Sequence, residues 1–323
     1  MRLALRRLAV VLAVLLVATA PRAQRRTASF DLVQMDLSAR TAALAGASGG
    51  LGGGDPTAAF SNPAFLTGEM SRQLSLAAVN HLSDVSAGTV LYARTLRGVD
   101  AAASVRYLSY GSFERSTADG TTDGTTFGAS EAAITLTAAQ TVAPRLRVGG
   151  NVHALFATLD DARAQALAAD VGATYEIPSQ RLVFGASVNN VGTVLSSLGA
   201  VADTLRRDVR VSVAKRLQYV PLTLTVTGYD LLGGDGAGAD SSAVVRAFDH
   251  VLVGGELALG RALTARAGYS PRRGRALRGD GRLDLAGLSA GFGITLRRFA
   301  LDYAFSNWGE TGALHQFGVR TRL

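Results

Sequence analysis

Cysteine is absent from the 323 residues of the chain, and lysine occurs only once, as Lys215. Without cysteine the chain has no disulfide framework, no thiolate zinc ligand and no cysteine nucleophile. Charged residues make up 18% of the chain and hydrophobic residues 48%, a balance that excludes intrinsic disorder. The basic residues form no clustered stripe with interleaved aromatic residues, so the sequence argues against a nucleic-acid partner.

Long apolar runs are missing too, except near the N-terminus. Residues 8–18 are unbroken apolar residues, preceded by arginines and followed by small residues. Such a run is too short to cross roughly 30 Å of hydrocarbon as a helix, and its flanks are typical of a secretory signal. We therefore predict that residues 1–23 are a signal peptide cleaved after Ala23, with an N-terminal membrane anchor as the alternative. The mature protein is then periplasmic, secreted or an outer-membrane barrel.

From residue 73 onward, apolar residues alternate with polar or small ones. Residues 167–177 and residues 288–296 follow this pattern without a break. A period of two is typical of strands with two unlike faces. The even number of such segments, fourteen, suits a bacterial outer-membrane barrel. They are predicted to begin near residues 73, 88, 99, 130, 145, 167, 182, 208, 221, 249, 263, 286, 299 and 314.

The predicted connections alternate between short and long along the chain. Short ones are expected at residues 97–98, 142–144, 178–181, 218–220, 260–262 and 297–298. Long ones are expected at residues 81–87, 110–126, 160–166, 193–207, 230–248, 270–285 and 306–313. Up-and-down barrels have short periplasmic turns and long outer loops, whereas a soluble sandwich has no reason to sort its loops in this way. The parity therefore places the C-terminus at the periplasmic end.

These patterns predict an all-β fold: a transmembrane antiparallel up-and-down barrel of about 14 strands spanning residues 73–323. The apolar set must face lipid, because polar side chains are unfavourable there. The polar or small residues on the other face of each strand then line the interior. They include Asp170, Glu176, Arg147, Arg210, Glu256, Arg266 and Asp302.

Residues 24–72 do not alternate and are predicted to form a hatch inside the barrel lumen. Residues 37–46 favour a short helix closed by glycine. A glycine run and two turn-forming pairs follow, Asp55-Pro56 and Asn62-Pro63-Ala64. A fourteen-strand interior is either filled or left as a pore, which favours the hatch over a periplasmic linker.

The chain resembles the PorQ family of type IX secretion barrels, within the wider group that includes PorV-like and FadL-type proteins. The resemblance extends from about residue 30 to the C-terminus. It depends on the following segments: Leu37-Ser38-Ala39-Arg40, Ala42-Ala43-Leu44, Asp55-Pro56, Asn62-Pro63-Ala64, Leu74-Ser75-Leu76, Val79-Asn80-His81-Leu82, residues 107–113, residues 129–131, residues 170–175, residues 266–269, Arg272-Arg273 and residues 287–294. The loop at residues 233–242 and the general replacement of lysine and aromatics depart from that family.

This resemblance implies a non-enzymatic part of the type IX secretion system in the outer membrane of a Gram-negative bacterium. It would help secrete cargo proteins or attach them at the cell surface. The implied partners are other secretion or surface-attachment components, cargo, membrane lipids and lipopolysaccharide. The loops expected to face them contain Asn80, His81, Arg272 and Arg273. The hatch motif consists of Asp55, Pro56, Asn62, Pro63 and Ala64.

Two other functions are kept as alternatives. One is a FadL-type transporter of hydrophobic small molecules, although charged inward residues disfavour an apolar tunnel. The other is a passive polar porin, which requires the hatch to leave the lumen open.

Catalysis and cofactors find little support in the sequence. Residues 287–291 match a nucleophile-elbow pattern around Ser289, but the strand alternation continues through them, where an elbow needs a sharp turn. The four histidines are dispersed, so we expect no metal site and no cofactor. The aspartates of residues 119–126 fit ordinary turns better than a calcium loop.

Overall fold

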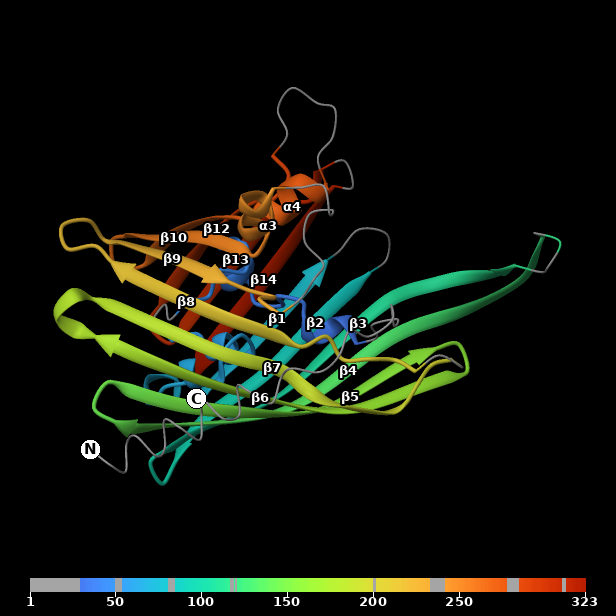
Figure 1. The fold of residues 1–323 in the computed structure, drawn as a ribbon, viewed down its shortest axis with the longest axis horizontal. Coiled ribbons are helices and arrows are strands. Elements are labelled where there is room, and N and C mark those ends of the chain that lie inside the picture. The colour runs from blue at the N-terminus through green and yellow to red at the C-terminus, as the bar shows by residue number, and fades with distance from the viewer. Residues whose placement is uncertain are drawn as a thin grey trace.

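The computed structural model describes residues 30–49, 54–80, 85–116, 119, 121–199, 202–232, 242–277, 285–309 and 312–323. The predicted signal peptide and His81 therefore lie outside the described residues. Fourteen antiparallel strands form a closed barrel in which β1 pairs with both β2 and β14 (Figure 1). The strands are β1 (Gln73–Asn80), β2 (Ser86–Leu96), β3 (Val99–Ser116), β4 (Thr122–Ala143), β5 (Leu146–Leu159), β6 (Ala162–Ile177), β7 (Leu182–Ser196), β8 (Asp208–Arg216), β9 (Leu222–Gly228), β10 (Val251–Leu259), β11 (Leu263–Tyr269), β12 (Leu288–Leu296), β13 (Phe299–Asn307) and β14 (Ala313–Arg322).

The two faces of each strand are sorted as the alternation predicts. On β6, Leu167 and Val171 are 48% and 49% exposed on the outside, whereas Ala168 and Asp170 are buried inside. Large exposed apolar side chains occur on the outer faces of the other strands as well. An outer surface of this kind requires hydrocarbon around it. None of the helices in the described ranges is long and apolar enough to cross a bilayer.

The loop prediction is wrong at two places. Residues 110–126 and residues 160–166 were expected to be long loops, but β3 continues to Ser116, β4 begins at Thr122, and β5 and β6 are separated only by residues 160–161. The β3–β4 hairpin consequently projects well beyond the rest of the barrel (Figure 1). Both faces of such a projection meet water, so its sequence has no apolar alternation to reveal the strands.

Other connections agree with the predicted parity. The short turns and the C-terminus lie at one end of the barrel, at the left of Figure 1. One of these turns contains η5 (Pro178–Gln180). At the opposite end, the connections after β9 and β11 contain α3 (Ala243–Asp249) and α4 (Pro271–Ala276).

The segment before β1 lies inside the barrel and is called the hatch here (residues 30–49 and 54–72). It consists of short pieces with bends between them: η1 (Asp31–Val33), α2 (Ala39–Ala43), η2 (Pro56–Phe60), η3 (Pro63–Phe65) and η4 (Gly68–Met70). The side chains of Ser38, Asp55 and Asn62 cap α2, η2 and η3. These caps satisfy backbone N–H groups that have no partner within such short helices.

Candidate functional site: the hatch and the lumen around it

Glycines on the inner faces of the strands make room for the backbone of the hatch. A Cβ on Gly172 would lie 2.0 Å from Asn62 Oδ1, and one on Gly149 would lie 2.6 Å from the carbonyl carbon of Pro63. A Cβ on Gly268 would lie 2.1 Å from the carbonyl carbon of Leu44. The barrel wall and the hatch therefore fit each other closely at widely separated strands.

Asn62 joins the hatch to the wall by its side chain. Its Nδ2 donates to the carbonyl oxygens of Ala173 and Ala186, on β6 and β7, at 3.2 Å each. Its Oδ1 accepts from the Ala64 backbone N–H at 2.9 Å, which starts η3. Pro63 follows at the first helical position, where its missing N–H has no consequence. The predicted Asn-Pro-Ala motif is thus an anchor of the hatch.

An ionic network holds the other side of the hatch. Arg40 on α2 donates to both oxygens of Glu256 at 2.9 Å, and Arg266 donates to Glu256 Oε2 at 2.7 Å. Arg266 also reaches Asp302 Oδ1 at 2.6 Å, and Arg320 Nη2 reaches Asp302 Oδ2 at 2.8 Å. Three arginines and two carboxylates therefore connect α2 with β10, β11, β13 and β14. Such buried groups are tolerated because each charge has a partner.

Asp55 is buried between the network and η2. Its oxygens accept from Ser38 Oγ at 3.0 Å and from the Thr57 hydroxyl at 2.6 Å. Burial opposes its charge, but the guanidinium groups of Arg320 and Arg40 and the Thr57 hydrogen bonds hold its pKa below the ordinary 3.8. The Asp55 carboxylate is therefore more stable in the folded protein than in the unfolded chain.

This lowered pKa predicts a pH dependence that Asp55→Asn abolishes. A carboxylate with a depressed folded-state pKa contributes stability above its unfolded pKa and loses it as pH falls through the folded value. We expect wild type to exceed D55N in unfolding free energy at pH 7, and the gap to shrink as pH falls below 3.8. Urea unfolding in detergent micelles at several pH values measures it. A gap that widens in acid would contradict the assignment.

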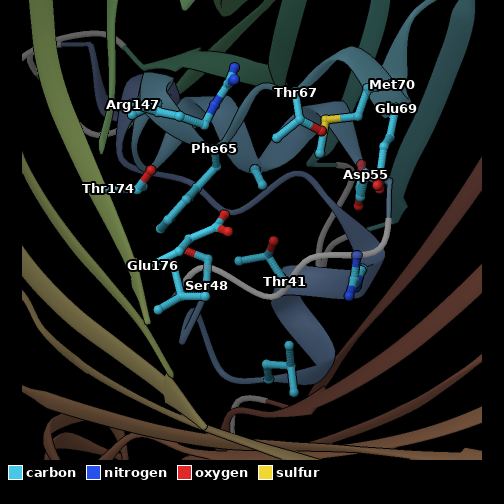
Figure 2. Close-up of a pocket in the computed structure, with 15 residues that line it drawn as sticks. Thr41, Ser48, Asp55, Phe65, Thr67, Glu69, Met70, Arg147, Thr174 and Glu176 are labelled. Carbon is cyan, nitrogen blue, oxygen red and sulfur yellow. The ribbon is translucent and has the colours of Figure 1, made fainter. Parts of the chain in front are cut away.

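A cavity of about 220 Å³ remains between the hatch and the wall. Figure 2 shows Thr41, Ser48 and Phe65 of the hatch around it, with Thr174 and Glu176 from β6. Arg147 borders it and donates to Asp100 Oδ2 at 2.7 Å and to the Leu66 carbonyl oxygen at 2.5 Å. The short-turn half of the lumen is therefore only partly filled, and both polar and apolar residues line the remaining space.

An apolar cluster occupies the outer half of the lumen on the side of β3 to β6. Phe30 and Leu32 of the hatch are each 1% exposed and pack in one cluster with Leu108, Leu155 and inward alanines of β4 to β6. The Leu32 backbone N–H donates to Glu131 Oε2 at 2.8 Å, which fixes η1 against β4. The hatch thus fills this apolar chamber with its own side chains.

The β6–β7 wall beside the apolar chamber is irregular. Register shifts separate Gln165 from Ala166 and Ala169 from Val171. Near the second shift, Asp170 Oδ1 accepts from the Asn190 backbone N–H at 2.7 Å, while Asp170 Oδ2 accepts from His153 and Asn151 side chains. A side chain therefore takes the place of a ladder acceptor at this point in the wall.

The four loop residues expected to face partners have different surroundings. Asn80 ends β1 and is exposed, and His81 lies outside the described residues. Arg272 donates to Asp230 Oδ2 at 3.0 Å. The Arg273 guanidinium stacks over the Trp308 ring at 5.7 Å, and burial lowers its pKa. Both arginines belong to α4 and are partly buried, so their contacts stabilise the outer loops.

The nucleophile-elbow pattern forms no catalytic site in the described residues. Ser289 lies within β12 and donates to Ser306 Oγ at 3.0 Å. Asp302 pairs with two arginines inside the barrel, whereas His315 is exposed and bonds the Tyr303 hydroxyl at 2.8 Å. Within the same ranges, no group of three or more potential ligands from His, Cys, Asp and Glu is placed to hold a metal ion.

Comparison with solved structures identifies the class of fold. The toluene transporter TodX of Pseudomonas putida is similar with a TM-score of 0.57 and 14% identity, covering 91% of this chain and 98% of TodX. A FadL homologue of Pseudomonas aeruginosa is similar with a TM-score of 0.52 and 10% identity, covering 94% and 100%. No protein-family profile matches the chain, and no curated protein does. The chain therefore has the fold of FadL-type outer-membrane barrels.

The ionic network, the inward glycines that contact the hatch backbone and the apolar chamber were not predicted as a site. Each inward charge was assigned to the correct face, but its partner comes from another strand or from the hatch. The alternation contains a usable signal for the glycines, because inward Gly residues recur on β5, β6, β11 and β12.

Proposed function

We propose that the protein is a FadL-type transporter that takes up hydrophobic small molecules through the outer membrane of a Gram-negative bacterium. The observation that carries the proposal is the apolar chamber in the outer half of the lumen. A water-filled porin has a polar interior, so such a chamber suits an apolar solute. The fold shared with TodX, whose name describes it as a toluene transporter, supports the same conclusion.

The hatch and the irregular wall supply a route for the solute. Phe30 and Leu32 fill the chamber, so a solute enters by replacing these side chains with its own apolar surface. The ion pairs of Arg266 with Glu256 and Asp302, in the short-turn half of the lumen, oppose direct passage of an apolar molecule. The shifted β6–β7 pairing lies beside the chamber, and we propose it as the place of exit toward lipid.

Uptake of radiolabelled toluene, with a sugar as the polar control, tests this function in a deletion strain complemented with variants. Ala166→Phe adds a ring to the chamber wall, whereas Leu167→Phe changes the lipid-facing neighbour on the same strand. We expect A166F to lower toluene uptake toward the deletion level, while L167F retains it. Heat-modifiable gel mobility confirms that both variants fold. Equal uptake in wild type and deletion strains would overturn the proposal.

The role in type IX secretion stays a prediction, together with its secretion partners. Its supporting resemblance lies in sequence segments, many of them in the hatch and β1 to β3. The same deletion strain distinguishes the two functions. Normal toluene uptake with cargo proteins retained in the periplasm would favour secretion.

A further inference from the structure

Basic residues gather at the short-turn end of the barrel. Each of the six short turns contains or adjoins an arginine, and further arginines lie at the start of β1 and the end of β14. All of these side chains are exposed. We call this set the arginine rim; it consists of Arg72, Arg97, Arg145, Arg181, Arg216, Arg261, Arg297, Arg298 and Arg322.

Several rim arginines occupy a backbone conformation that does not favour arginine. Of the ten non-glycine residues with positive φ in the described ranges, five are Arg72, Arg97, Arg145, Arg181 and Arg297, with φ from 47° to 72°. Glycine and asparagine adopt this left-handed region more easily. Arginine at these turns therefore points to a use for its charge.

Within the described residues the rim arginines lack carboxylate partners, whereas several arginines of the outer end have them. None of the rim arginines forms a salt bridge in the described part of the chain. At the outer end, Arg115 pairs with Asp160, Arg272 with Asp230, and Arg275 with Asp249. The barrel is thus electrostatically asymmetric along its axis, with positive charge in excess at the short-turn end.

Exposed aromatic side chains accompany the rim. Tyr219, in the β8–β9 turn, is 91% exposed, and Phe299, beside Arg298, is 56% exposed. A recess at the β8–β9 turn is lined by Arg181, Arg216 and Tyr219 among others. Aromatic rings next to basic side chains are typical of the level where hydrocarbon meets lipid headgroups.

We propose that the arginine rim binds the phosphate groups of anionic phospholipids in the periplasmic leaflet. The charges lie on turns all around the circumference of the barrel. Lipids surround the barrel in the same way, whereas a protein partner would contact only one side of the circumference. Each arginine near an anionic surface is worth about 1 kcal/mol, which is roughly fivefold in lipid preference. The rim would hold the barrel at a fixed depth, independently of what the lumen transports.

Spin-labelled lipids test the proposal on the full-length mature protein reconstituted in phosphatidylcholine vesicles. Electron paramagnetic resonance gives the association of labelled phosphatidylglycerol relative to labelled phosphatidylcholine. We expect about fivefold preference for phosphatidylglycerol in wild type, and a clearly smaller preference in R97N/R145N/R297N, which lacks three of the nine rim charges. Asparagine suits the left-handed conformation of all three positions, so folding is preserved, and heat-modifiable gel mobility verifies it.

The matched control is R163Q/R207Q/R246Q, which removes equal charge from exposed positions at the outer end. This variant should keep the wild-type preference. Equal association of both lipids with wild type, or equal loss of preference in both triple variants, would overturn the proposal. Abolition of the preference by millimolar inorganic phosphate would show a site for free phosphate instead of a lipid.

Discussion

Replacing Gly268 by valine is expected to displace the hatch and open the lumen of the barrel to ions. The new Cβ would lie 2.1 Å from the carbonyl carbon of Leu44 and 2.6 Å from the Ala45 nitrogen, both backbone atoms that no side-chain rotation can move away. Overpacking of this kind destabilises the docked hatch by about 1–3 kcal/mol. The fraction of molecules with a displaced hatch should therefore rise roughly 5- to 150-fold. We expect sustained single-channel currents in planar bilayers where wild type is silent, and faster tryptic cleavage after Arg40.

Gly255→Val is the matched control for this experiment. Gly255 lies on the adjacent strand β10, and a Cβ there would meet only leucine side chains at 3.5 and 3.7 Å and a carbonyl oxygen at 4.0 Å. We expect G255V to stay closed. If neither variant conducted ions and cleavage after Arg40 were unchanged in both, the close fit of hatch and wall would be contradicted.

The barrel could be predicted from sequence because strand periodicity is a local property. Alternation fixed the two faces, and loop parity fixed which ends of the strands lie together. The method failed at residues 110–126, where the strands continue into water and the apolar period disappears. It also failed at residues 160–166, where buried Ala164 and Ala166 alternate with exposed Arg163 and Gln165 but were taken as part of a loop. The helix expected at residues 37–46 is shorter, α2 ending at Ala43, because Ala45 and Gly46 adopt positive φ.

The site could be predicted only in part, because its contacts join residues far apart in the chain. Asn62 was singled out as a turn former, yet its partners on β6 and β7 are more than a hundred residues away. The arginine rim illustrates the same limit. Its members are separated by whole hairpins, so no clustered basic stripe is visible until the barrel closes.

The fold and the resemblance support different functions. Many of the segments that resemble secretion barrels lie in the hatch and the first strands, and those in the hatch make docking contacts with the barrel wall. Capping residues such as Ser38, Asp55 and Asn62 are constrained by those contacts. The apolar chamber also packs the hatch, but its apolar lining is the feature that favours an apolar solute over ions or water.

Asp302→Asn is expected to produce the largest loss of stability. Among the described residues, Asp302 is the carboxylate that forms a salt bridge with Arg320, and it also pairs with Arg266. Its side chain is 4% exposed, so its removal leaves buried positive charges facing each other. Breaking a buried pair in this way costs about 3–5 kcal/mol. The unfolding free energy in urea, followed by Trp308 fluorescence in detergent micelles, measures the loss.

Two further variants determine whether the loss arises from the network. Asp160→Asn removes an exposed partner of Arg115, with side chains 35% and 45% exposed, and should cost less than about 1 kcal/mol. Arg320→Gln added to D302N removes one of the stranded charges, so the double variant should be more stable than D302N alone. If D302N stayed within 1 kcal/mol of wild type, or if R320Q destabilised it further by its full separate effect, the charges would not act as one network. The hatch would then depend on its close fit to the glycines of the wall and on its other contacts, such as those of Asn62 and of the Leu32 N–H.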